Sequence, residues 1–176
     1  MTNNGDVFQS TKRFGLRSVY PCTRYLTFGP WIYLVPQFKP DSVLILGYAG
    51  GTVAGLIRLF YGNAVTITGV DINKPEDLYY DVNLIRADAQ KYIKTCDYHE
   101  VIVVDLYDEC SFPCSFVTTE EFVRDVSAKC NYLIVHAEVS TDMRVYECLN
   151  QVKVLSLNQK RFYYFTIGRC SKLPIR

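Results

Sequence analysis

The stretch VLILGYAGGTVAG, residues 43–55, contains in order a continuous apolar run, a glycine turn and the start of a helical pattern. An unbroken apolar run is typical of a strand buried on both faces, as in a parallel sheet. The apolar residues after the glycines recur at helical spacing, at Val53, Leu56, Ile57 and Phe60. Residues 43–46 are therefore predicted to form a strand, and residues 52–62 a helix closed by Gly62.

The same alternation of β-rich runs and helical patterns continues along the chain. Strands are predicted at residues 64–70, 82–88, 100–106 and 131–139, and helices at 90–96, 118–130 and 141–150. Thr118 and Glu121 have the spacing of a capping box at the start of the second of these helices. The runs at 152–157 and 161–167 are joined by too few residues for a helical crossover, so we expect an antiparallel hairpin.

These elements predict a doubly wound, mostly parallel α/β sheet of Rossmann-like type with a C-terminal antiparallel β-hairpin. A chain of 176 residues suits one such domain, which we place at residues 41–176. Residues 1–40 are expected to be an N-terminal extension. Its last part, which contains Trp31 and Tyr33, is aromatic and interrupted by prolines, and is compatible with a helix, a lid over the site or packing on a sheet edge.

The composition excludes several functional classes. With 19 basic and 18 acidic residues the net charge is +1, so no global field favours nucleic acid or an anionic membrane. No apolar run reaches the roughly 18 residues of a membrane span, and the first residues lack an apolar signal segment, so a cytoplasmic location is expected. The seven cysteines form no paired motif, which indicates reduced thiols and no metal site.

The glycine turn and a later aspartate indicate a nucleoside site. In a doubly wound sheet, ligands bind outside the carboxyl ends of the strands, where the glycines bring bare main chain close to them. Asp71 closes the second predicted strand, 20 residues after Gly51, where a carboxylate can accept both hydroxyls of a ribose. A tight structural turn followed by a solvated aspartate is the simpler alternative.

Two further aspartates are predicted to lie at strand ends. Asp88 ends the third strand and Asp105 the fourth, so both are expected at the same sheet edge as Asp71. Each of them could instead cap a helix, and Asp108 and Glu109 are compatible with solvated loop residues. His136 lies inside an apolar strand, where a hydrogen-bonded core residue and a catalytic base are both open readings.

Five blocks of the sequence resemble the nucleotide-binding domain of the spermidine synthase-like family, within the class I S-adenosylmethionine-dependent methyltransferase superfamily. They are VLILGYAGGTV, GVDI, RADAQKYI, VIVVDLYDE and TTEEFVRDVSAKC. They occur in the family's order and at roughly its spacing over about residues 40–140. The resemblance implies S-adenosylmethionine, or its decarboxylated form, as the cofactor.

The resemblance also implies roles for individual residues. The cofactor contacts that it implies are Gly47, Tyr48, Ala49, Gly50, Gly51, Asp71, Ile72, Asp88, Ala89 and Asp105. Asp71 would bind the ribose, and Asp88 with Ala89 would face the adenine. Asp105 matches the family's catalytic acid, which orients the attacking amine and helps to deprotonate it.

Gly50 departs from the family pattern in a way that bears on whether the chain transfers methyl or aminopropyl groups. Polyamine synthases carry an aspartate in the glycine turn, whereas this sequence has Gly50 at the matching position, and few residues precede its first strand. The sequence therefore favours methyl transfer to an unknown small acceptor, with an amine among the candidates. Aminopropyl transfer and a non-catalytic binding protein remain alternatives, and a dinucleotide dehydrogenase is disfavoured because the turn lacks GxGxxG. No nucleic acid or membrane partner is expected, and a homodimer is compatible with the sequence.

Overall fold

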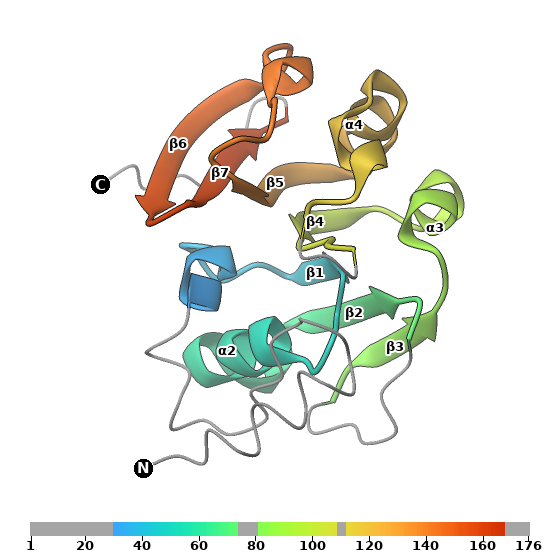
Figure 1. The fold of residues 1–176 in the computed structure, drawn as a ribbon. Helices are drawn as coiled ribbons and strands as arrows, with labels where there is room; N and C mark the ends of the chain where they lie inside the picture. The colour runs from blue at the N-terminus through green and yellow to red at the C-terminus, as the bar shows by residue number, and fades with distance from the viewer. Residues whose placement is uncertain (1–29, 74–80, 109–111, 168–176) are drawn as a thin grey trace.

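The computed structural model describes residues 30–73, 81–108 and 112–167. These residues form a seven-stranded sheet in the order β3-β2-β1-β4-β5-β7-β6 (Figure 1). The strands are β1 Ser42–Leu46, β2 Thr66–Asp71, β3 Asn83–Arg86, β4 His99–Val104, β5 Cys130–Glu138, β6 Asn150–Leu157 and β7 Lys160–Thr166. The α-helices are α2 Thr52–Tyr61, α3 Ala89–Thr95 and α4 Glu120–Ser127. Short 3-10 helices are η2 Pro30–Leu34, η3 Gly62–Ala64, η4 Ser115–Thr118 and η5 Arg144–Tyr146.

The strand directions confirm the predicted fold class. β3, β2, β1, β4 and β5 run parallel, whereas β7 is antiparallel to both β5 and β6 and lies between them. The chain reverses the strand order after β3, when it crosses from β3 to β4 on the other side of β1. Ligands of doubly wound sheets bind at such a point, outside the carboxyl ends of the strands.

Each face of the sheet carries its own hydrophobic core. Helix α2 covers one face together with η2, and α3 and α4 cover the other (Figure 1). Because side chains alternate along a strand, β4 sends Val101 and Val103 to the α2 face, and Ile102 and Val104 to the α3–α4 face. The central strands are therefore continuously apolar, as their burial on both sides requires.

The segment before β1 packs over the α2 face of the sheet. The ring of Tyr33 lies 5.2 Å from that of Phe162, and the ring of Phe38 lies 4.7 Å from that of Tyr132. The Tyr61 hydroxyl donates a hydrogen bond of 2.5 Å to the carbonyl of Pro36. Residues 30–38 thus pack on a face of the sheet, not on its edge as expected, and η2 is the only helical turn among them; the role as a lid stays a prediction.

Two sequence predictions about the ends of elements are corrected by the structure. The third strand ends at Arg86, and Asp88 lies beyond it as the cap of α3. Helix α4 is capped by Thr119, whose side chain accepts a bond from the Phe122 amide, because Thr118 still belongs to η4. The predicted capping box with Thr118 is therefore absent, and Glu121 pairs with Lys94 instead.

The predicted helix at residues 141–150 is wrong: only η5 forms there. Tyr146 explains the difference, because its side chain is completely buried, stacks on Phe165 and donates from its hydroxyl to the carbonyl of Val117. The chain delivers this ring to the core from a 3-10 turn and begins β6 four residues later, at Asn150. The connection containing Pro75 lies outside the described residues. Within the described part of the chain, no helix is long and apolar enough to cross a membrane.

Candidate functional site

Gly47 holds the turn that leaves β1. Its φ is +90°, and its amide and that of Tyr48 both donate to the carbonyl of Val70, at 2.9 and 3.1 Å. A Cβ atom built on Gly47 would lie 2.1 Å from the carbonyl oxygen of Asp105. Only glycine avoids this clash at a positive φ, so the turn brings the ends of β1, β2 and β4 into direct main-chain contact.

Gly51 of the turn and Gly69 of β2 make room for the side chain of Tyr48. The Tyr48 ring is buried among the residues of the α2-face core. A Cβ on Gly51 would lie 2.5 Å from its hydroxyl oxygen, and a Cβ on Gly69 would lie 2.3 Å from its ring. The bare main chain at Gly51 and Gly69 is therefore occupied by Tyr48, and at Tyr48 only the main chain could contact a ligand.

Asp71 is fixed by two main-chain hydrogen bonds. One carboxylate oxygen accepts from the amide of Ala49 at 2.8 Å, and the other accepts from the amide of Asn73 at 2.8 Å. The residue is only 3% exposed. These two bonds orient the carboxylate at the end of β2. The Ala49 amide, which the resemblance assigned to the cofactor, is thereby committed to Asp71.

Asp88 combines two roles that the sequence left as alternatives. Its side chain accepts from the Gln90 amide at 2.9 Å and caps α3, the simpler of the two readings. The same side chain also lines a pocket at the carboxyl edge of the sheet. Asp108, by contrast, is exposed and accepts from the Phe112 amide at 3.0 Å, which fits a loop role; Glu109 lies outside the described residues.

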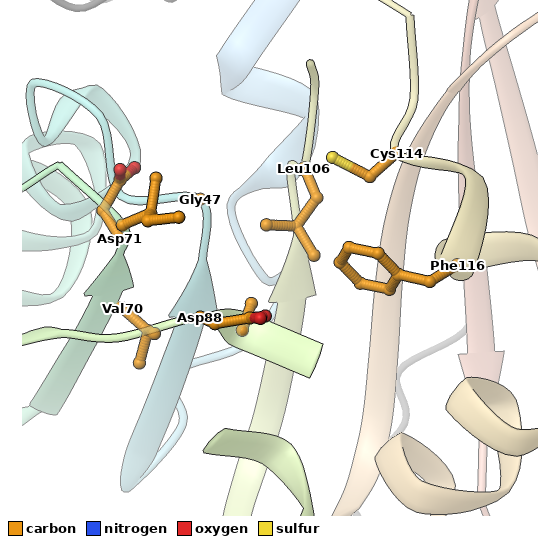
Figure 2. A pocket seen from close by; sticks show the side chains of 9 residues that line it. Gly47, Val70, Asp71, Asp88, Leu106, Cys114 and Phe116 are labelled. Atoms are coloured by element: carbon orange, nitrogen blue, oxygen red, sulfur yellow. The ribbon is translucent and has the colours of Figure 1, made fainter. Parts of the chain in front are cut away.

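The pocket lies where the ends of β1, β2 and β4 meet the start of α3. Its cavity volume is about 100 Å³, and its lining consists of Gly47, Val70, Asp71, Ile72, Asp88, Ala89, Leu106, Cys114 and Phe116. In Figure 2, Asp71 lies on one side of Gly47, and Leu106, Cys114 and Phe116 lie on the other. An apolar wall with two carboxylates is the kind of surface that holds a base and a ribose.

The pocket brings together five of the predicted contacts: Gly47, Asp71, Ile72, Asp88 and Ala89. The other predicted contacts, Tyr48, Ala49, Gly50, Gly51 and Asp105, do not line it. Their assignment to the cofactor stays a prediction. The sequence analysis missed four lining residues: Val70, Leu106, Cys114 and Phe116. Val70 and Leu106 could have been predicted, because they are the sequence neighbours of Asp71 and Asp105.

The Asp105 side chain does not line this pocket, and its contacts lie on the α2 face. There its carboxylate lies 2.7 Å from Nδ1 of His136, whose side chain is 3% exposed. The His136 ring stacks on Phe162 with a centroid separation of 4.6 Å and lies 4.9 Å from the Tyr107 ring. Burial raises the pKa of the Tyr107 hydroxyl, and the charges of Asp105 and Glu138 raise it further. Of the three aspartates predicted at strand ends, Asp71 and Asp88 thus line the pocket, and Asp105, which follows β4, does not.

No metal-binding group is found among the described residues, in the sense of three or more neighbouring His, Cys, Asp or Glu side chains. Of the described cysteines, Cys96 and Cys130 are buried thiols and Cys148 is an exposed one. Burial raises the pKa of the Cys130 thiol to about 12, which makes it unreactive.

The fold is that of class I S-adenosylmethionine-dependent methyltransferases. No protein-family model and no curated protein matches the sequence, so the likeness is one of structure. Fibrillarin of Aeropyrum pernix, solved with natively bound S-adenosyl-L-methionine, superposes with a TM-score of 0.53 at 19% identity and covers 72% of this chain. TrmN from Thermus thermophilus superposes with a TM-score of 0.56 at 12% identity and covers 91% of this chain. The mitomycin 7-O-methyltransferase MmcR superposes with a TM-score of 0.57 at 10% identity and covers 83% of this chain. The match spans 66%, 52% and 55% of those three chains.

Proposed function

We propose that this chain is an S-adenosylmethionine-dependent methyltransferase. The observation that carries the proposal is the pocket that Gly47, Asp71 and Asp88 line together at the carboxyl edge of the sheet. Structural neighbours with the same fold, such as fibrillarin, were solved with S-adenosyl-L-methionine. When bound, this cofactor supplies a methyl carbon activated by a sulfonium, so the chain itself would have to bind, orient and accept a proton.

The lining residues fit the nucleoside end of this cofactor. Asp71 is oriented by main-chain amides and would accept from the ribose hydroxyls. Ile72 and Leu106 offer apolar surface to the adenine, and Asp88 would accept from its amino group. The cavity of about 100 Å³ is smaller than the roughly 300–1,000 Å³ of typical ligand sites, so it would enclose only part of the nucleoside and leave the rest of the cofactor outside.

The finer assignment is to the spermidine synthase-like branch of the superfamily, with a small acceptor. Five sequence blocks support it, and Gly50 in place of the family's aspartate favours methyl over aminopropyl transfer. The buried thiols of Cys96 and Cys130 agree with a reducing compartment such as the cytoplasm.

Calorimetry with S-adenosylmethionine, S-adenosylhomocysteine and methylthioadenosine tests this proposal. We expect the first two ligands to bind, and each to stabilise the fold by about 2.7 kcal/mol at 100 times its dissociation constant. Asp71→Asn should weaken binding at least tenfold while keeping one acceptor oxygen, whereas the exposed Asp108→Asn should bind like the wild type.

Each alternative predicts a different binding pattern. Methylthioadenosine binding at least as well as S-adenosylhomocysteine would indicate aminopropyl transfer, because only the latter has a carboxylate. Binding of none of the three by the wild type would contradict the proposal and leave a protein that keeps the fold without this cofactor. Equal binding by the wild type and Asp71→Asn would show that the pocket has been misplaced.

A further inference from the structure

The chain after β4 forms a short hairpin at the wall of the cofactor pocket. At its base, the amide of Cys114 donates to the carbonyl of Leu106 at 3.0 Å, and both of these residues line the pocket. Two residues farther along each arm, the amide of Asp108 donates to the carbonyl of Phe112 at 2.8 Å. The amide of Phe112 in turn donates to Oδ1 of Asp108 at 3.0 Å, an acceptor that an asparagine at this position would keep. These hydrogen bonds fix the main chain of Phe112 relative to the pocket.

The alternation of side chains along the hairpin places Phe112 on the pocket side. Opposite residues of an antiparallel pair direct their side chains to the same face, and the face changes with every residue. Leu106 and Cys114 face the pocket, so Phe112, two positions from Cys114, faces the same side. Tyr107 belongs to the intervening pair and faces the other side, where its ring lies 4.9 Å from that of His136. The hairpin thus lies between the pocket and the His136 ring.

The Phe112 ring is an exposed apolar group at the mouth of the pocket. Its exposed fraction is 61%, and it belongs to neither of the two hydrophobic cores. One exposed phenyl ring needs no explanation by itself, so its place on the pocket side is what indicates a role. Ile72 lines the pocket and is 58% exposed. Asp71 lies on one side of the pocket, and Leu106 with Cys114 on the other (Figure 2). The two exposed apolar side chains that adjoin these residues therefore flank the mouth.

We propose that Phe112 is a binding residue that holds the base of the nucleoside against Ile72, an inference that rests on the proposed function. The cavity of about 100 Å³ encloses only part of a nucleoside, so part of the base has to lie at the mouth. The edge of the base that meets Asp88 is inside, and the rest of the ring system stacks on Phe112. Such stacking is independent of the hydrogen-bonding groups of the base, because every base has a π face.

The two faces of the hairpin favour the base, and not the methyl acceptor, as the group that Phe112 contacts. The resemblance assigns the transfer to Asp105, whose carboxylate contacts His136 on the α2 face. An acceptor at Asp105 is therefore separated from Phe112 by the hairpin. The base enters the pocket on the side of Leu106, where the hairpin presents the Phe112 ring. A nucleoside without the methionine end of the cofactor should therefore keep this contact.

Calorimetry with S-adenosylhomocysteine and adenosine tests the contact. We expect Phe112→Ala to weaken the binding of both ligands by the same factor, about tenfold, because both contain the base. Phe112→Trp should bind both at least as tightly as the wild type. Phe60→Ala is the matched control, because its ring is 52% exposed on α2, and it should bind like the wild type. The urea midpoint of Phe112→Ala should equal that of the wild type, because the ring is exposed. Affinities of Phe112→Ala within about twofold of the wild type, or a loss confined to S-adenosylhomocysteine, would overturn the proposal.

Fluorescence reports the stacking directly. The chain has a single tryptophan, Trp31, so Phe112→Trp in a Trp31→Phe background emits only from position 112. Adenosine should quench this emission, because its base stacks on the indole, whereas Phe60→Trp in the same background should not respond. An unchanged emission at position 112, with calorimetry showing that adenosine binds, would contradict the stacking alone. Failure of the wild type to bind either ligand would contradict the cofactor assignment, and the role of Phe112 with it.

Discussion

Gly47 lies in close contact with the main chain of Asp105, and a Cβ atom on Gly47 would lie only 2.1 Å from the Asp105 carbonyl oxygen. This contact joins the strand end that would bind the cofactor to the strand end that carries the acid. It leaves no freedom for the turn to move independently of β4, because the Asp105 amide also donates to the carbonyl of Leu46 at 2.9 Å. Main-chain contacts therefore fix the relative positions of the ends of β1 and β4.

The first prediction concerns this contact. Gly47→Ala should destabilise the fold by more than Gly62→Ala, although both glycines have positive φ, at +90° and +70°. A Cβ on Gly62 meets nothing within 4 Å, so Gly62→Ala carries only the conformational cost of about 1–3 kcal/mol. Gly47→Ala should add about 1–3 kcal/mol for the steric overlap. Urea denaturation measures both, and equal losses would show that the turn can relax.

The second prediction separates the two roles of Asp88. Asp88→Asn should keep the cap of α3, because asparagine caps helices about as well as aspartate, whereas Asp88→Ala should lose about 1 kcal/mol of stability. Both variants should bind S-adenosylhomocysteine more weakly if the carboxylate faces the adenine. Asp88→Asn with unchanged affinity would leave only the capping role.

The third prediction identifies the cap of α4. Thr119→Ala should lower the unfolding free energy by about 0.5–2 kcal/mol, because its hydroxyl accepts from the Phe122 amide. Thr118→Ala, one residue earlier, should change it by no more than about 0.5 kcal/mol. The two variants differ by a single position, so thermal unfolding of the pair compares the observed cap with the one that the sequence suggested. A larger loss at Thr118 would restore the capping box.

The fourth prediction is a pH dependence at His99, at the opposite end of β4 from the site. Burial lowers the pKa of His99 from 6.5, with Asp97 opposing in part, and its Nδ1 lacks a hydrogen-bond partner in the described part of the chain. The unfolded chain therefore binds the proton more readily than the folded one. The stability from His99 is complete above its unfolded pKa and is lost as the pH falls through that value toward the folded pKa.

His99→Gln removes this contribution. Between about pH 7.5 and pH 5 the variant should lose less stability than the wild type, measured by urea denaturation at each pH. His136 is present in both proteins and cancels in the comparison. Parallel losses in the two proteins would show that His99 accepts a proton without cost in the folded state.

Much of the fold could be predicted because each strand carries its own pattern. The apolar runs identified every strand of the sheet, and the short link before β7 required a hairpin. The helix predicted at residues 141–150 was wrong because Tyr146 enters the core from a 3-10 turn, not from a regular helix. Local pattern does not distinguish these cases when a tertiary contact decides the conformation.

The candidate site was predictable only in part. The rule for strand ends placed Asp71 and Asp88 at one pocket, and the alternation along β4 contains the information that Asp105 faces away from Leu106. The partnership of Asp105 with His136 depends on the register of β4 and β5, which no short pattern encodes. Cys114 and Phe116 reach the pocket from irregular chain, where the sequence has no period to follow.

The position of β7 has a consequence for biosynthesis. β7 occupies an interior place in the sheet although it is the last strand of the described chain, and β6 contacts the sheet only through it. A nascent chain can thus assemble β1 to β5 early, but β5 keeps an open edge until residues 160–166 leave the ribosome. During that interval His136 lacks the Phe162 ring against which it stacks, so the surroundings of the Asp105–His136 contact are completed last.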